Sequence, residues 1–130
     1  MIYTYEDYKK KNKTIDIDTC LKVHSMMALE IGADEDAIEL YDELVEKCAE
    51  YTLMRAYWTI RDRDWKIDND PGRTAKHDSL IIKFNQLARY LKSQGKEAGW
   101  RELLGDEKEY RKKIGDMACF LTYLQAINGR

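Results

Sequence analysis

The chain has 130 residues and a net charge of −2, with 44% hydrophobic and 35% charged residues. This length and balance are typical of one soluble globular domain with a core of its own. No apolar run approaches the ~18 residues of a membrane span, and the first residues lack the order of a secretory signal. The overall excess of basic residues that marks many nucleic-acid-binding proteins is also missing. We therefore expect a cytoplasmic protein.

The chain contains three cysteines, Cys20, Cys48 and Cys119, which lie far apart in the sequence. An odd number without paired spacing argues against a disulfide framework or a zinc site. We expect all three to be small core residues, and we expect no cofactor.

Residues 1–17 form an arm that is difficult to assign to helix or strand. Three tyrosines in this arm offer apolar surface, and we expect them to dock it onto the rest of the protein. These tyrosines are Tyr3, Tyr5 and Tyr8.

The first clear helix is predicted over residues 18–31. Asp18 or Thr19 is the expected N-cap, since both side chains accept hydrogen bonds from free backbone N–H groups. Gly32 stands where helices often end with a left-handed residue. Asp34 is the expected cap of the next helix.

The next helical pattern runs over residues 35–66 without proline or glycine. Its first half, residues 35–50, has apolar residues on one face only. Its second half is apolar nearly all round, since Arg55 is the only charged residue of the segment 51–60. A helix that is apolar all round is surrounded by protein. We therefore expect its second half to lie in the middle of a bundle or at a homodimer interface over residues 51–65. Its principal apolar stripe is Ile38, Tyr41, Val45, Cys48, Thr52, Ala56 and Ile60, and a second stripe is Leu40, Leu44, Tyr51, Met54, Trp58 and Trp65.

A turn at residues 69–72 holds the only proline of the chain beside a glycine. We expect a third helix to begin at Thr74 or Asp78 and to end before Gly95. A final helix is predicted from Asp106 to about residue 127.

Four principal helices joined by short loops are typical of an antiparallel bundle. The sequence therefore predicts an all-α, four-helix bundle-like single domain over residues 18–130, with the arm 1–17 docked against it.

Two histidines and two aspartates are candidate metal ligands. His24, the pair His77-Asp78, and Asp116 follow one another in an order that resembles the HD-domain metal phosphohydrolases. That resemblance implies a divalent metal that activates water. The alternative is structural: Asp78 caps or begins a helix, and His77 lies at its exposed start.

A second enzyme resemblance involves acids on two helices. Glu43 and Glu46, with Gly115-Asp116, resemble parts of the MazG-like nucleotide pyrophosphatases. These enzymes hold Mg²⁺ with carboxylates from facing helices, which suits a hard cation. Lys112 and Lys113 depart from that pattern, because they stand where acids are expected.

The same acids have a non-catalytic interpretation. Residues 30–50 carry nine acidic residues and one lysine, a local charge of −8. Residues three and four apart share a helix face, so the long helix is expected to present an acidic surface of Glu39, Glu43, Glu46 and Glu50. Such a surface attracts a basic protein partner, as in small acidic proteins of mobile elements that inhibit nucleic-acid-binding proteins.

Other features bear on partners. The tyrosine-rich arm is followed by basic residues over 9–13, an arrangement that suits nucleic acid but is also common on protein surfaces. We do not expect nucleic acid to be the partner. Trp58 and Trp65 lie seven residues apart on one helix face, which favours core packing or a dimer interface.

The C-terminal half also resembles a family. The segments His77-Asp78, 84–91 and 114–119 are similar to small uncharacterised helical proteins of Gram-positive bacteria and their mobile elements. The resemblance implies no activity. Gly115 within a helix disfavours helix formation by up to ~1 kcal/mol relative to alanine, so we expect a neighbouring helix to pass close to it. Asp116 is predicted to form an ion pair with Arg89.

Together these features predict a non-catalytic accessory or regulatory protein that acts through a helical surface, with a metal-dependent nucleotide phosphohydrolase as the alternative.

Overall fold

The computed structural model describes residues 16–61, 73–105 and 110–127. These residues form four longer helices and one short one, with no strand in the described ranges. They are α2 (Ile17–Ile31), α3 (Glu35–Arg61), α4 (Arg73–Ser93), α5 (Trp100–Leu103) and α6 (Tyr110–Ile127). The all-α prediction is confirmed. The predicted arm falls almost wholly on residues 1–15, which lie outside the described residues.

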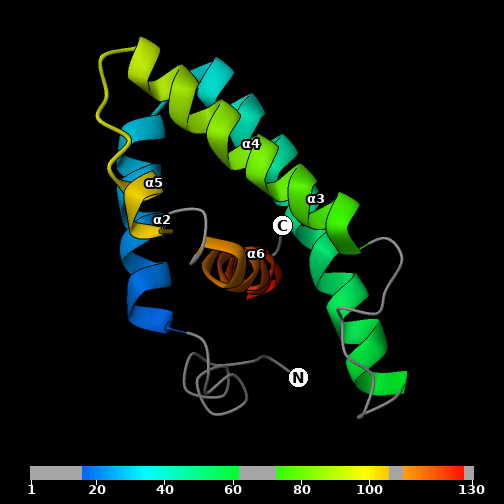
Figure 1. Cartoon of the computed structure of the whole chain (residues 1–130). Coiled ribbons are helices and arrows are strands. Elements are labelled where there is room, and N and C mark those ends of the chain that lie inside the picture. The colour runs from blue at the N-terminus through cyan, green and yellow to red at the C-terminus, as the bar shows by residue number, and fades with distance from the viewer. Residues whose placement is uncertain (1–15, 62–72, 106–109, 128–130) are drawn as a thin grey trace.

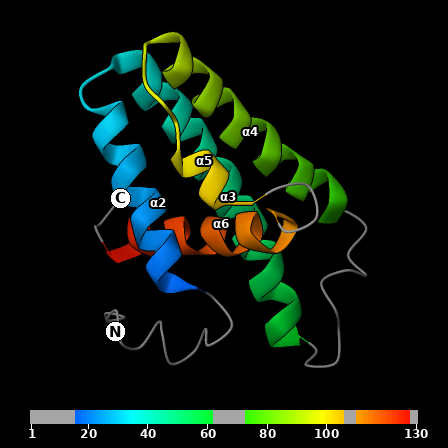
Figure 2. The ribbon, with the colours of Figure 1, turned by 60° about the vertical axis from the view of Figure 1, so that its left-hand side comes forward.

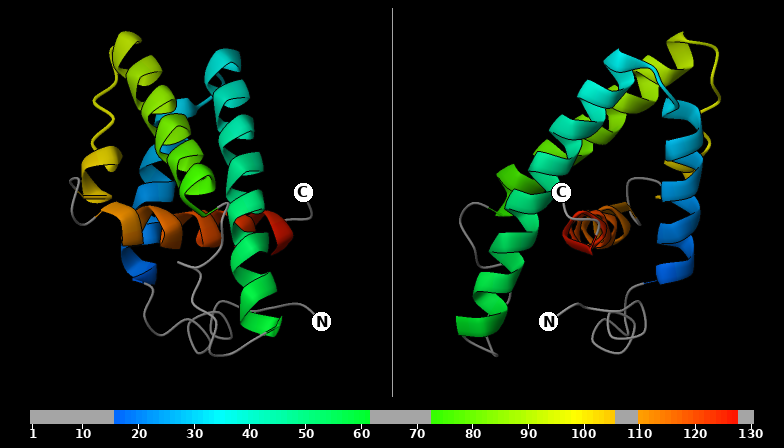
Figure 3. Two further views of the ribbon diagram at one scale, coloured as in Figure 1. Left: turned by 45° about the vertical axis from the view of Figure 1, so that its right-hand side comes forward. Right: turned by 180° about the vertical axis from the view of Figure 1, so that it is seen from behind.

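The four longer helices pack around one core. Helices α3 and α4 form an antiparallel pair, and α2 carries α5 on the opposite side of the molecule (Figure 1). Helix α6 lies between them and runs across the other helices, as Figures 2 and 3 both show. The fold therefore differs from the expected antiparallel bundle in its last helix, which runs across the other helices instead of alongside them.

Helix α6 is the centre of the core. All five residues from 114 to 118 are buried, including Gly115 and Asp116. A Cβ atom built on Gly115 would lie 2.7 Å from the Tyr51 hydroxyl oxygen and 3.3 Å from two ring carbons. The expected close approach is thus confirmed, and it is the buried ring of Tyr51 from α3 that fills the space.

The burial of residues 51–54 tests only the first turn of the segment that was predicted to be enclosed. Tyr51 and Met54 are buried within the chain, whereas Leu53 is 70% exposed. Among the described side chains, those of α6 are the ones buried nearly all round the helix. The core face of α3 takes residues from both predicted stripes, Leu44 and Tyr51 from the second and Cys48 from the first, while Ile38 of the first stripe is exposed.

The corner between α2 and α3 is held by specific caps. Asp16, rather than the predicted Asp18 or Thr19, caps α2 and accepts hydrogen bonds from the Thr19 backbone at 3.1 Å and hydroxyl at 2.6 Å. Gly32 ends α2 with φ of 51°, as predicted. Asp34 caps α3, because its Oδ1 accepts from the backbone N–H groups of Asp36 and Ala37.

Asp34 also ties this corner to the far end of α4. The Tyr90 hydroxyl donates to Oδ1 at 2.9 Å and to Oδ2 at 2.8 Å. The hydrogen bond from Tyr90 lowers the pKa of Asp34, and the same contact raises the pKa of Tyr90 to about 12. Ionised aspartate and neutral tyrosine are therefore the forms that the folded protein favours.

Replacing Tyr90 with phenylalanine is expected to destabilise the protein most at neutral pH. Because the pKa of Asp34 is depressed on folding, its contribution is present above its ordinary value of 3.8 and is lost as the pH falls through the lowered value. Because the pKa of Tyr90 is raised, its contribution is present below 10.0 and is lost as the pH rises towards about 12. Urea unfolding across this pH range measures the difference between Tyr90→Phe and the parent.

The matched control is Asp34→Asn, which keeps a good N-cap but removes the charge. It should flatten the acid limb of the pH profile. A Tyr90→Phe difference that is equally large well below pH 3.8 would contradict the assignment.

Helix α5 is fastened to α2 by one carboxylate. Glu30 accepts from the Trp100 indole N–H at 2.8 Å and from the Ala98 backbone N–H at 3.0 Å. Ala98 has the only positive φ, 52°, of any non-glycine residue in the described ranges. The Nε of Arg101 donates to Asn85 of α4 at 2.8 Å, so α5 is held from both sides.

Helix α4 begins earlier than predicted, at Arg73. His77 consequently lies in the second turn and is buried, with its ring 6.0 Å from the Tyr51 ring in an edge-on contact. The expectation that His77 lies at an exposed helix start is therefore wrong. Asp78, its neighbour, is exposed.

The cysteines occupy the interior positions expected of small core residues. Cys20 and Cys48 are buried and Cys119 is half-buried, and all three are free thiols. Burial raises the pKa of the Cys48 thiol, which makes it a poor nucleophile. No helix in the described ranges is long and apolar enough to span a membrane.

Candidate functional site

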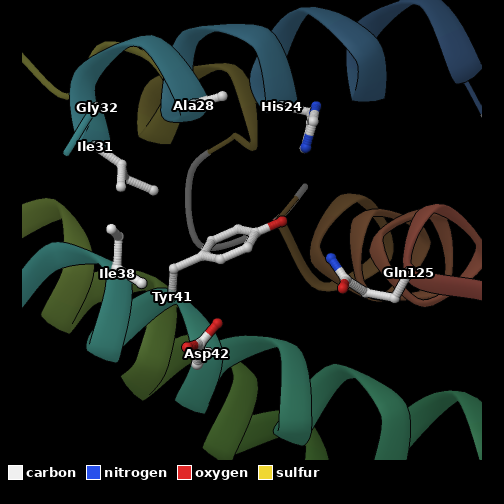
Figure 4. Close-up of a pocket in the computed structure, with 8 residues that line it drawn as sticks. All are labelled: His24, Ala28, Ile31, Gly32, Ile38, Tyr41, Asp42 and Gln125. Carbon is white, nitrogen blue, oxygen red and sulfur yellow. The ribbon is translucent and has the colours of Figure 1, made fainter. Parts of the chain in front are cut away.

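A hollow of about 530 Å³ opens where α2, α3 and α6 meet. Figure 4 shows its lining side chains from these three helices and the turn after α2. They are His24, Ala28, Ile31, Gly32, Ile38, Tyr41, Asp42 and Gln125. The crossed position of α6 creates this hollow, because α2 and α3 diverge from their shared corner and α6 closes only the far end (Figure 1).

The hollow has an apolar end and a polar end. Ile31 and Ile38 face each other near the corner, and the Tyr41 ring extends from α3 across the opening (Figure 4). The Tyr41 hydroxyl points towards the side chains of His24 and Gln125. An apolar floor with a few polar groups at one end is the usual composition of a binding pocket.

The electrostatics of the hollow are set by Asp42. Burial lowers the pKa of His24, so its imidazole is neutral at neutral pH. Asp42 is exposed at the edge of the hollow and carries the only full charge among those lining residues that the structure describes. The hollow therefore favours a ligand that combines apolar surface with positive charge.

Asp42 extends the predicted acidic surface of Glu39, Glu43, Glu46 and Glu50, because it lies three residues after Glu39 and four before Glu46 on α3. Glu39, Asp42, Glu46 and Glu50 are exposed on this helix, whereas Glu43 is half-buried beside α4. Two of them have lysine partners: Glu43 is 3.5 Å from Lys83 of α4, and Glu50 is 3.3 Å from Lys47. Glu39 and Glu46 are exposed and form no ion pair within the described part of the chain.

The four candidate metal ligands are not brought together. His24 lines the hollow, His77 is buried against Tyr51, and Asp78 is exposed on α4. Asp116 lines a separate small cavity with Asp16 and Lys113. No group of three or more His, Cys, Asp or Glu side chains in the described ranges is arranged to hold a metal ion. The described residues therefore do not assemble the HD-like ligand set.

The MazG-like arrangement fails for the same reason. Glu43 is half-buried beside Lys83 of α4 and Glu46 is exposed, whereas Asp116 is buried within the core. Carboxylates that share a Mg²⁺ ion must converge on one point. The predicted pair of Asp116 with Arg89 is also not formed, since Arg89 is exposed and lines a different hollow.

The predicted dimer interface is partly accounted for inside one chain. Tyr51 and Met54 are covered by the protein's own core. Trp65 lies outside the described residues, and the side chain of Trp58 is not among those described. Those two positions stay a prediction.

The hollow was not predicted from the sequence. Tyr41 and Ile38 were assigned to an apolar stripe, and Gln125 gave no signal because a polar residue near a helix end is ordinary. The acidic residues did give a signal, through their spacing. A further hollow, between α4 and α5, was also missed; it is lined by Ile82, Asn85, Ala88, Arg89, Lys92 and Arg101.

Comparison with known protein families, with curated proteins and with solved structures finds no match.

Proposed function

We propose that this is a non-catalytic accessory or regulatory protein that binds a basic segment of another protein. The partner would place an apolar side chain in the hollow and its basic residues on the acidic surface. The observation that carries this proposal is the continuity of the two features. Asp42 lines the hollow and belongs to the acidic surface, so one ligand can contact both.

The negative charges of the acidic surface favour a positively charged partner. Glu39 and Glu46 lack ion-pair partners in the described ranges, so a basic ligand gains attraction without breaking an internal contact. Exposed charges of this kind raise association rates and select partners by charge. They also repel phosphate groups, which disfavours nucleic acid as the ligand of this surface.

The hollow supports an apolar anchor. Ile38 is 40% exposed although it is a large aliphatic residue. Binding energy at protein interfaces is concentrated in a few side chains that fill pockets, surrounded by weaker polar contacts. An amphipathic segment with one bulky apolar residue and neighbouring lysines or arginines fits this arrangement.

The test is affinity capture from the native host, followed by calorimetry with the identified partner in purified form. Glu39→Lys with Glu46→Lys should weaken binding at least about tenfold, with a steep dependence on salt. The matched control is Glu97→Lys with Glu102→Lys, which changes the net charge equally at exposed positions away from α3.

A second variant distinguishes the contribution of the hollow to binding from that of the acidic surface. Ile38→Ala should weaken binding about tenfold or less while leaving the salt dependence unchanged, because it removes apolar contact alone. Leu29→Ala, at an 83% exposed position on α2, should have no effect. The proposal would be refuted if neither the Glu39→Lys, Glu46→Lys variant nor the Ile38→Ala variant changed the affinity for the partner.

A further inference from the structure

The hollow between α4 and α5 is basic and has an exposed apolar neighbour. It has a volume of about 280 Å³, and within the described ranges its charged lining residues are Arg89, Lys92 and Arg101, without a carboxylate. The hydrogen bond from the Arg101 Nε to Asn85 holds that guanidinium in place. Ile82 is 53% exposed at its edge. A concentration of positive charge in a chain of net charge −2 calls for an acidic ligand.

The chain itself carries a surface of matching pattern. On α4, Arg89 follows the exposed Ile82 by seven residues, and Lys92 follows three residues later. On the outer side of α3, Glu46 precedes the exposed Leu53 by seven residues, and Asp42 lies one turn further. Seven helical residues span about 10 Å in either case. Laid antiparallel, the two helices would place Leu53 on Ile82 and Glu46 on Arg89.

The two surfaces face different sides of the molecule. Helices α4 and α5 lie in front of α3 in Figure 2, and α3 lies in front of α4 in the right-hand view of Figure 3. One molecule therefore does not satisfy its own basic hollow with its own acidic surface. Contact between unlike surfaces of identical chains is heterologous, and it repeats from molecule to molecule.

We propose that the basic hollow between α4 and α5 binds the acidic surface of α3, with Leu53, on a second copy of this chain. Self-association is then head-to-tail and salt-sensitive. This inference rests on the proposed role of the acidic surface in protein binding, and it makes a basic partner a competitor of self-association.

Sedimentation velocity over a range of protein concentrations tests the inference. At low salt the mean mass should rise with concentration beyond that of a dimer, and at high salt it should fall to that of a monomer. Arg89→Ala with Lys92→Ala should weaken association at least tenfold, and so should Glu39→Gln with Glu46→Gln. Lys22→Ala with Lys76→Ala removes the same charge elsewhere and should leave association unchanged.

Mixing the two neutralised variants gives the sharpest result. Each variant keeps the surface that the other has lost, so an equimolar mixture should form one-to-one pairs and stop there, since the remaining surfaces lack their charges. A monomer at every concentration at low salt would overturn the inference. Association that survives the Arg89 and Lys92 changes, or that stops at a dimer in the unaltered protein, would overturn it as well.

These outcomes are independent of the proposed partner. Arg89 and Lys92 lie outside the partner surface, so their loss tests self-association alone. Ile38→Ala tests the hollow between α2 and α3 alone, because Ile38 takes no part in the proposed contact between copies.

Discussion

Replacing Trp100 with alanine is expected to lower the free energy of unfolding by about 3–5 kcal/mol. Trp100 is fully buried, and its ring lies 6.4 Å from that of Phe84 on α4. Its loss leaves a cavity between α2, α4 and α5 and removes the donor to Glu30. Chemical denaturation followed by circular dichroism measures the change.

Two further variants divide this effect into packing and hydrogen bonding. Trp100→Phe keeps much of the volume but removes the N–H donor, so it should cost about 1–3 kcal/mol because the Glu30 carboxylate loses a partner. Leu29→Ala, on the exposed side of α2, should stay within about 0.5 kcal/mol of the parent. A Trp100→Ala variant as stable as Leu29→Ala would show that α5 does not contribute to the core.

Replacing Gly115 with alanine is expected to destabilise the protein by about 1–3 kcal/mol, although alanine is the better helix former. The added methyl group would lie 2.7 Å from the Tyr51 hydroxyl and 3.3 Å from its ring. Tyr51 is buried and packs edge-on against His77, so it has little room to move. Overpacking therefore outweighs the helix propensity gain of about 1 kcal/mol.

The partner variant for this test is Tyr51→Phe. It removes the oxygen atom that makes the closest approach but leaves the ring, so it should relieve part of the penalty. A double-mutant cycle of Gly115→Ala and Tyr51→Phe should give a coupling of about 0.5–3 kcal/mol. If Gly115→Ala stabilised the protein, the prediction of overpacking against Tyr51 would be contradicted.

Local chemistry made several elements predictable. The end of α2 at Gly32 and the cap of α3 at Asp34 follow from backbone preferences that act within a few residues. The acidic surface follows from helical spacing on one element. The small residue at 115 indicated a close approach, although it did not identify Tyr51 as the neighbour.

Features that depend on the arrangement of several helices were not predictable. The sequence predicted α6 as a helix but not that it is enclosed on nearly every side, because the burial of Gly115 and Asp116 depends on the helices that pack around them. The hollow requires the relative placement of α2, α3 and α6, which no single segment encodes. The order of histidines and aspartates resembled that of a metal site, but the order of residues in a sequence does not show whether their side chains lie close together.

The central position of α6 has a consequence for how the chain matures. Every helix that packs on α6 precedes it in the order of synthesis, so α2, α3 and α4 leave the ribosome with their inward sides uncovered. Incomplete chains with exposed apolar surface are prone to aggregate and to be held by chaperones. The core of this protein can therefore close only after α6 has been synthesised and has packed against α2, α3 and α4.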